Sequence, residues 1–273
     1  MSALLERLTD RLARESRLLV AFSGGADSAL LASVAHTVLG ERSLAVTAVS
    51  ASLPAGERAA ARAFARERGF AHVEVCTDEL DRAEYVANTG NRCFHCKSAL
   101  FDAMAPLASM FGARMALGTN TDDLGDHRPG QAAATLRGAV FPMVDAGLSK
   151  ADVRAVSAEL GLATAEKPAA ACLSSRIAYG DEVTPELLGR IERAEDGLHG
   201  LGFRSGRVRA HASGTVARIE IPEADLPSAL ERRSELLAVV RGAGFTFGTL
   251  DLVGFRSGSM NALLTLTPVI RNG

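Results

Sequence analysis

The sequence has 273 residues, of which 47% are hydrophobic and 23% charged, and this composition is typical of a globular protein. The formal net charge is −2, no basic tail or block of lysines and arginines appears, and there are two Tyr and no Trp, so nucleic acid is not indicated as a main partner. No apolar run approaches the roughly 20 residues of a membrane span, and the N-terminal stretch lacks the features of a secretory signal peptide. We therefore expect a cytoplasmic protein without nucleic-acid or membrane partners, whose four cysteines are reduced unless they hold metal or take part in chemistry.

After an amphipathic N-terminal helix, short apolar runs alternate with helical segments. Strands are expected at 18–22, 44–50, 71–75 and 114–117, with a fifth at 140–144, and helices at 28–39, 57–68 and 97–111. This alternation predicts an α/β fold with a doubly wound parallel sheet. Ligands of such sheets bind at the carboxyl ends of the strands, so the residues that follow the strands are candidates for function.

The pattern changes after about Arg176. A helix at 185–201 leads to strands at 206–211 and 216–221, and a helix at 226–243 precedes a last strand at 246–253. This order predicts a second, smaller α+β domain with a mostly antiparallel sheet. We assign residues 1–175 to the first domain and 176–273 to the second, which we expect to bind substrate and to mediate oligomerisation.

The strongest motif is the loop SGGADS, which directly follows the first expected strand and opens a helix. Gly24 and Gly25 let the backbone approach a phosphate without a Cβ clash, and the helix N-terminus favours an anion. Ser23 and Ser28 add hydroxyl donors, while the carboxylate of Asp27 suits Mg²⁺ rather than phosphate. The alternative is a simple turn whose Ser or Asp caps the helix.

This loop resembles that of the PP-loop ATP pyrophosphatases, which have a HUP-like fold, and it lacks the Gly-Lys-Ser/Thr of a Walker A loop. The resemblance implies that ATP is cleaved between its α and β phosphates with Mg²⁺ present. A substrate oxygen attacks the α phosphorus, which gives an adenylate and pyrophosphate. Gly118 and Asn120, after the fourth expected strand, are implied to join the loop in binding ATP.

Further sequence segments restrict the resemblance to one family of PP-loop enzymes. They are NRCFHCK at 91–97, GTNTDDLGDHRPG at 118–130, EKPAAACLSSR at 166–176, RVR at 207–209, ARIE at 217–220 and GFRSGSMN at 254–261. Together with the phosphate loop they resemble the LarE family of ATP-dependent sacrificial sulfur transferases. The likeness covers nearly the whole chain, whereas PP-loop enzymes in general share only the first motif.

The resemblance implies a reaction in the biosynthesis of the nickel-pincer nucleotide, the cofactor of lactate racemase. A carboxylate of pyridinium-3,5-biscarboxylic acid mononucleotide is adenylated, and a protein cysteine displaces AMP to form a thioester. Elimination then leaves the sulfur on the substrate as a thiocarboxylate and converts the cysteine into dehydroalanine. Two rounds give the bisthiocarboxylate, and the family also suggests a homo-oligomer.

Cys172 is the expected sulfur-handling residue. It lies four residues before Arg176 in a linker flanked by polar residues, and nearby positive charge raises the thiolate fraction of a cysteine. Arg176 and Glu195 are expected to join it in catalysis. The alternative is a buried thiol that only fills space, which is the role that we expect for Cys76 at the end of a strand.

Cys93 and Cys96 form a CxxC pair, whose spacing suits a redox pair, half of a zinc site or two ligands of an iron–sulfur cluster. Cys172 could supply the third ligand of a [4Fe-4S] cluster whose open iron binds a labile sulfide. The resemblance includes family members of this type, in which no cysteine is sacrificed. Two idle thiols are the remaining alternative.

Charged residues suggest two further sites. Asp122, Asp123 and Asp126 form an acidic loop after the fourth expected strand, and Asp123, with Glu220, is a candidate Mg²⁺ ligand beside Asp27. Arg207 and Arg209 alternate along one strand face, so both can point at the phosphate of the substrate. Helix caps and solvated strand faces are the alternatives.

Three rival functions remain. An amide-forming PP-loop ligase of the NAD or GMP synthetase kind would need an ammonia source, and no glutaminase domain is recognised. A tRNA thiolase would need a basic RNA-binding face. A non-catalytic nucleotide sensor would bind ATP without exchanging its pyrophosphate.

Overall fold

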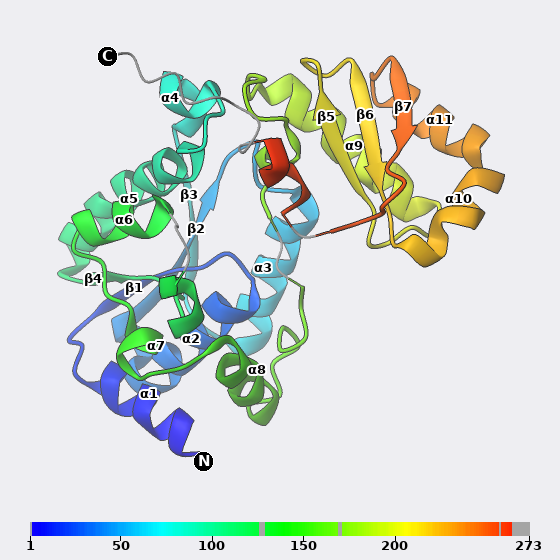
Figure 1. The fold of residues 1–273 in the computed structure, drawn as a ribbon. Helices are drawn as coiled ribbons and strands as arrows, with labels where there is room; N and C mark the ends of the chain where they lie inside the picture. The colour runs from blue at the N-terminus through cyan, green and yellow to red at the C-terminus, as the bar shows by residue number, and fades with distance from the viewer. Residues whose placement is uncertain (1, 126–128, 169–170, 257, 264–273) are drawn as a thin grey trace. The chain divides into compact units, whose positions relative to one another are not determined.

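A computed structural model describes residues 2–125, 129–168, 171–256 and 258–263 (Figure 1). The chain divides into two compact units. The first comprises Met1–Glu79 and Cys93–Ala170, and the second comprises Leu80–Arg92 and Ala171–Gly273. The segment Leu80–Arg92 therefore groups with the C-terminal part of the chain, and the domain boundary predicted at residues 175 and 176 stays a prediction.

The first unit contains a parallel sheet of four strands in the order β3-β2-β1-β4. The strands are β1 (Leu18–Ala21), β2 (Ser43–Val49), β3 (His72–Cys76) and β4 (Arg114–Ala116). The helices are α1 (Ala3–Ala13), α2 (Ala26–Leu39), α3 (Ala55–Arg68), α5 (Arg92–Phe111), α6 (Pro129–Leu136), α7 (Pro142–Asp145) and α8 (Lys150–Glu159). The prediction of an α/β fold with a parallel sheet is confirmed.

Helices cover both faces of this sheet (Figure 1). Alternate residues of β1 point to opposite faces, and all four of its residues are buried, so both faces carry a hydrophobic core. Leu18 and Val20 pack into a core that includes Leu8 of α1 and Leu30 of α2. Leu19 and Ala21 pack on the other side, in a core that includes Leu100 and Met104 of α5. The winding reverses beside β1, since β2 and β3 extend the sheet on one side and β4 on the other. Such a reversal is where ligands of open α/β sheets bind.

Two predictions for the first unit are wrong. A strand at 140–144 does not form: Val140 makes a single bridge to Ala116, and α7 begins at Pro142. Proline has no N–H for a sheet ladder and suits the first turn of a helix. Cys76, expected in the core, is exposed at the end of the edge strand β3.

The second unit contains a sheet of three strands in the order β5-β6-β7, made of β5 (Arg207–His211), β6 (Val216–Glu220) and β7 (Phe247–Leu250). Its helices are α4 (Ala83–Val86), α9 (Pro185–Gly200), α10 (Leu226–Glu231) and α11 (Arg233–Gly242). The smaller second fold is confirmed, but its sheet is mixed, since β6 pairs antiparallel with β5 and parallel with β7. The single helix expected at 226–243 is broken at Arg232.

Short 3-10 turns complete the description: Gly40–Arg42, Glu79–Asp81, Thr121–Gly125, Leu173–Arg176, Glu223–Asp225 and Ser259–Asn261. Within the residues that the structure describes, no helix is long and apolar enough to cross a membrane.

Gly118 fixes the distance between β4 and the start of α2. A Cβ at this position would lie 2.9 Å from the Ser28 amide nitrogen and 3.0 Å from the Asp27 carbonyl carbon. Real Cβ atoms do not approach backbone so closely, so the loop after β4 and the first turn of α2 depend on glycine here.

We predict that Gly118→Ala lowers the free energy of unfolding by about 1–3 kcal/mol, because backbone must move to admit the methyl group. Gly56→Ala is the matched control, since a Cβ there meets no atom within 4 Å. The control should be neutral or stabilising by up to about 1 kcal/mol, as expected for Gly→Ala in a helix. Urea unfolding of both variants measures the difference, and equal midpoints would contradict the prediction.

Candidate functional site

The loop 23–28 has the geometry of an anion site. It follows β1 directly, and Gly24 has a positive φ of 72°. A Cβ added at Gly24 would lie 3.0 Å from the Cβ of Ala61, which is too close for an unstrained contact. Gly25 is the N-cap of α2 and has no side chain to bond the first-turn N–H groups. These N–H groups and the helix dipole are therefore available to an anion. The hydroxyls of Ser23 and Ser28 lie 3.1 Å apart and complete the polar lining.

Asp27 meets two cationic or polar partners from distant segments. Its Oδ1 accepts a hydrogen bond from Asn120 Nδ2 at 3.2 Å, and its Oδ2 lies 2.6 Å from Lys150 Nζ. With Gly118 against Ser28, the structure thus brings together the predicted ATP-binding residues that follow β1 and those that follow β4. Lys150 was missed from the sequence. A signal existed, because a lysine in the first turn of a helix opposes the dipole and so points to a use elsewhere.

Lys167 is a second lysine at the loop. Its ammonium donates to the Gly24 carbonyl oxygen at 3.0 Å and pairs with Glu57 Oε2 at 2.7 Å. In the sequence Lys167 lies five residues before Cys172. In the structure its side chain lies in the first unit and touches the glycine turn of the phosphate loop.

The residues fit a nucleotide triphosphate with Mg²⁺. Two lysines, two hydroxyls and a helix N-terminus supply hydrogen-bond donors of the kind that phosphate oxygens accept. Within the described ranges no group of three His, Cys, Asp or Glu side chains is placed to hold a metal ion. Mg²⁺ does not require such a cage, because one or two carboxylates, phosphate oxygens and waters suffice. Asp27 fits the role of that carboxylate.

The carboxylates of the acidic loop after β4 accept hydrogen bonds from nearby backbone N–H groups. Asp123 Oδ2 accepts from the Asn120 N–H at 3.1 Å, and Asp122 Oδ2 accepts from the Lys150 N–H at 2.9 Å. These bonds hold Asn120 and Lys150 beside Asp27. Whether Asp123 also binds Mg²⁺ stays a prediction, and Asp126 lies outside the described residues.

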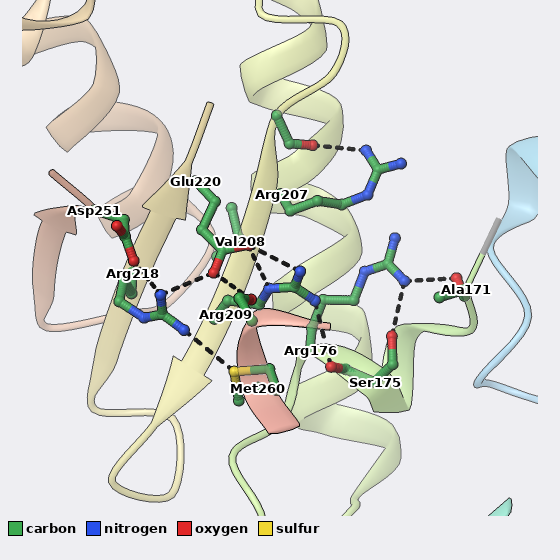
Figure 2. Close-up of polar contacts among 12 residues, drawn as sticks. Ala171, Ser175, Arg176, Arg207, Val208, Arg209, Arg218, Glu220, Asp251 and Met260 are labelled. Carbon is green, nitrogen blue, oxygen red and sulfur yellow. Dashed lines mark hydrogen bonds and ion pairs between the residues drawn. The ribbon is translucent and has the colours of Figure 1, made fainter. Parts of the chain in front are cut away.

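Cys172 lies in the second unit, as the N-cap of the turn Leu173–Arg176. Its carbonyl oxygen accepts from Ser175 N at 3.0 Å, from Ser175 Oγ at 2.7 Å and from Arg176 Nη1 at 2.9 Å. Arg176 Nη1 also donates to the Ala171 carbonyl at 2.5 Å (Figure 2). The thiol is half-buried and not part of a disulfide. The structure therefore fixes the backbone of this cysteine and leaves its sulfur available.

Glu195 secures the guanidinium that holds this turn. Arg176 Nε lies 3.0 Å from Glu195 Oε1, and both side chains are buried. Glu195 Oε1 also accepts from the Val208 N–H at 3.1 Å, which ties the pair to β5. The predicted catalytic residues Cys172, Arg176 and Glu195 are thus linked in series: Glu195 holds the guanidinium of Arg176, which bonds the Cys172 carbonyl.

The segment Leu80–Arg92 braces the same turn from another side. Tyr85 Oη lies 2.6 Å from Ser174 Oγ, and Arg92 Nη1 donates to the Ser174 carbonyl at 2.8 Å. Asn88, fully buried with a positive φ of 51°, donates to the Ala178 carbonyl at 2.8 Å. Sequence reasoning missed these residues because nothing local marks a side chain whose partner lies about 90 positions away.

Buried charges on β5 and β6 neutralise one another (Figure 2). Glu220 is fully buried, and its oxygens lie 2.8 Å from Arg209 Nη2 and 2.8 Å from Arg218 Nη1. Ser259 Oγ donates to Glu220 at 2.7 Å. That Glu220 binds Mg²⁺ stays a prediction, but both of its oxygens already accept strong donors. Asp251 also pairs with Arg218. Burial opposes its charged form, yet bonds from the Val253 N–H and Arg218 outweigh this and lower the pKa of Asp251.

Arg207 differs from Arg209, although both alternate on one strand as predicted. Its Nη1 donates to the Gly206 carbonyl at 2.8 Å, and its guanidinium lies 5.6 Å from the centroid of the Phe255 ring. Arg207 is half-buried, whereas Arg209 is buried against Glu220. Arg207 is therefore the better placed of the two to meet an anion from solvent.

Cys93 and Cys96 both lie near the start of α5, where Cys93 is exposed and Cys96 half-buried. A spacing of three places them on one helix face, which fits two ligands of a cluster. They belong to the first unit and Cys172 to the second. A shared [4Fe-4S] cluster stays a prediction.

Comparison with known proteins identifies the family. No family model matches the chain. An uncharacterised protein of Synechocystis sp. is 44% identical over 264 residues, covering 96% of this chain and 98% of that protein. An uncharacterised protein of Methanocaldococcus jannaschii is 24% identical, covering 89% and 92%. The pyridinium-3,5-bisthiocarboxylic acid mononucleotide synthase of Lactiplantibacillus plantarum is 37% identical over 252 residues, covering 91% and 90%. At this identity and coverage the chain belongs to the LarE family, that of the pyridinium-3,5-bisthiocarboxylic acid mononucleotide synthases.

Proposed function

We propose that this chain is an ATP-dependent sulfur transferase that converts the carboxylates of pyridinium-3,5-biscarboxylic acid mononucleotide into thiocarboxylates. The observation that carries the proposal is the similarity, over nine tenths of both chains, to a synthase of the bisthiocarboxylate product. That product contains sulfur where a carboxylate oxygen stood, so a carboxylate must be activated and a sulfur donor supplied. Each of the two compact units supplies residues for one of these tasks.

Activation is assigned to the phosphate loop. The first-turn N–H groups of α2 and the lysines 150 and 167 bind the triphosphate of ATP, which orients the α phosphorus toward a substrate carboxylate oxygen. Attack forms the acyl adenylate and releases pyrophosphate. Mg²⁺, when bound, neutralises phosphate charge, and Asp27 is the residue that would hold it. Lys150 then loses its carboxylate partner and is free to pair with phosphate instead.

We predict that Asp27→Ala folds normally and loses pyrophosphate release by about a hundredfold or more, as expected for removing a group that positions transition-state charge. Asp10→Ala, an exposed carboxylate on α1, is the matched control and should keep full activity. Pyrophosphate and AMP are quantified together with the melting temperature. Full activity in folded Asp27→Ala would remove the loop from the mechanism.

Binding of the substrate phosphate is assigned to the second unit. We predict that replacing Arg207 lowers substrate affinity, whereas replacing Arg209 lowers the stability of the fold. Arg207→Ala should weaken binding of the pyridinium substrate by about ten- to a hundredfold, because a charge-assisted phosphate contact contributes roughly 1.5–3 kcal/mol. Arg209→Ala leaves the buried Glu220 with one guanidinium fewer. It should therefore lower the free energy of unfolding by about 3–5 kcal/mol.

Calorimetric titration with substrate and with ATP, followed by urea unfolding, separates these effects. ATP affinity should be unchanged in Arg207→Ala, since the phosphate loop belongs to the other unit. Equal losses of stability in the two variants, or equal losses of ATP and substrate affinity, would contradict the assignment.

Sulfur donation is assigned to Cys172. Its thiolate attacks the acyl carbon, AMP leaves, and elimination transfers the sulfur to the substrate. Two features support this residue: its backbone is held by the guanidinium of Arg176, and its thiol is half-buried and outside any disulfide. One thiol suffices for this route, whereas a [4Fe-4S] cluster with sulfide on its open iron needs Cys93, Cys96 and Cys172 together.

We predict that turnover lowers the intact mass of the protein by the elements of hydrogen sulfide and places dehydroalanine at position 172. Sulfur transfer then stops at one atom per chain, and Cys93→Ser and Cys96→Ser stay active. In the cluster route the protein is brown, needs all three cysteines, keeps its mass and turns over repeatedly with added sulfide. Cys76→Ala, an exposed cysteine elsewhere, is the control and should be active in both cases. Undiminished sulfur transfer by Cys172→Ala would contradict both routes, because each of them needs the sulfur atom of Cys172.

A further inference from the structure

We propose that Ser175 and Arg176 form an oxyanion hole for the carbonyl oxygen of Cys172 itself, and that this hole drives the elimination that releases the sulfur. The inference rests on the proposed function of Cys172 as a sacrificed residue. It assigns Ser175 a catalytic role and gives Arg176 a stated one, since both touch an atom on which charge develops during the reaction.

The elimination creates its negative charge on the backbone. In the thioester intermediate the Cα–H of Cys172 is adjacent to the Cys172 carbonyl, so loss of this proton to solvent water or hydroxide places the electron pair on that oxygen as an enolate. The pair then forms the Cα=Cβ bond and the Cβ–Sγ bond breaks. Sulfur departs with its electrons as the substrate thiocarboxylate, and the residue becomes dehydroalanine. The step needs no oxidant or reductant.

The hydrogen bonds at this oxygen suit an enolate better than a neutral amide. Three donors converge on it: Ser175 N at 3.0 Å, Ser175 Oγ at 2.7 Å and Arg176 Nη1 at 2.9 Å. A neutral carbonyl has two lone pairs, and the first of these donors already closes the turn. The hydrogen bonds from the hydroxyl and the guanidinium are therefore additional to what the turn requires. Both bonds become stronger as negative charge develops on the carbonyl oxygen.

Burial makes the guanidinium effective. Arg176 is 3% exposed, so water does not screen its charge at the Cys172 carbonyl. Glu195 engages Nε and Nη2 of Arg176, at 3.0 and 3.3 Å, and leaves Nη1 for the turn. The brace from Tyr85 and Arg92 holds the adjacent Ser174. The donors are thus fixed before the reaction, which is the condition under which an oxyanion hole lowers a barrier.

The first test follows the thioester by intact-protein mass spectrometry with ATP and the pyridinium substrate. Ser175→Ala keeps the backbone N–H and removes only the hydroxyl. We expect the thioester, seen as the mass of the substrate less water, to accumulate and to convert to dehydroalanine about tenfold or more slowly than in the wild type. Pyrophosphate release in the first turnover should be unchanged. Ser205→Ala, an exposed serine of the same unit, is the control and should match the wild type. Elimination at the wild-type rate in Ser175→Ala would overturn the proposal.

The second test needs neither ATP nor substrate. A bis-alkylating reagent such as 2,5-dibromohexanediamide converts cysteine into a cyclic sulfonium, which eliminates to dehydroalanine through the same Cα–H loss. We expect this elimination at Cys172 to be slower in Ser175→Ala than in the wild type, and equal in the two proteins at the exposed Cys76. Equal rates at Cys172 would overturn the oxyanion hole. If the wild type forms neither the thioester nor dehydroalanine with substrate, the proposed sulfur source fails, while the sulfonium rates still decide on the hole.

Arg176→Lys gives a further check that allows for folding. The lysine keeps the positive charge beside Glu195 but cannot reach both the carboxylate and the Cys172 carbonyl with a planar fork. We expect a folded protein, by melting temperature, with slowed sulfonium elimination at Cys172. An unchanged elimination rate in a folded Arg176→Lys variant would limit the hole to Ser175 and overturn the assignment of Arg176.

Discussion

The reversal of the sheet beside β1 is the constraint on which the first unit depends. Because β2 and β4 flank β1, the loops that follow β1 and β4 leave the sheet at the same edge. Gly118 lets these loops touch at backbone distance, with a would-be Cβ at 2.9 Å from Ser28 N. That contact places Asn120 and, through Asp122, Lys150 against Asp27. The N-terminus of α2, which has no side-chain cap, thus has a carboxylate and two lysines around it, and this is the site at which we propose that phosphate binds.

Charge neutrality organises the second unit in a different way. Arg176, Arg209 and Arg218 are each paired with a carboxylate, on Glu195, Glu220 and Asp251. Such pairs contribute little net stability, but losing one partner is costly, so they fix where each guanidinium lies. Arg176 uses that fixed position to bond the backbone around Cys172. The placement of Cys172 therefore depends on a guanidinium that bonds the backbone of its turn.

Local patterns predicted much of this arrangement and missed what depends on distance along the chain. The apolar runs at β1 to β4, the SGGADS loop and the CLSSR turn were readable because their signals lie within a few residues. The strand expected at 140–144 failed because Pro142 starts a helix, and Arg232 breaks one expected helix into two. Lys150 and Lys167 meet the loop across 123 and 143 positions. Pairing at that range is set by the fold, so no spacing rule could reveal it.

The segment Leu80–Arg92 has a consequence for how the chain can be assembled and dissected. It is flanked on both sides by residues of the first unit, yet its buried Asn88 and Arg92 bond not only to each other but also to the carbonyls of Ala178 and Ser174. During synthesis this segment leaves the ribosome long before those partners exist, so its polar groups remain solvated until the C-terminal half emerges. Separate expression of the two halves would divide the second unit from part of its own scaffold. A truncated protein that keeps the second unit whole must instead contain Leu80–Arg92 together with the C-terminal region from Ala171.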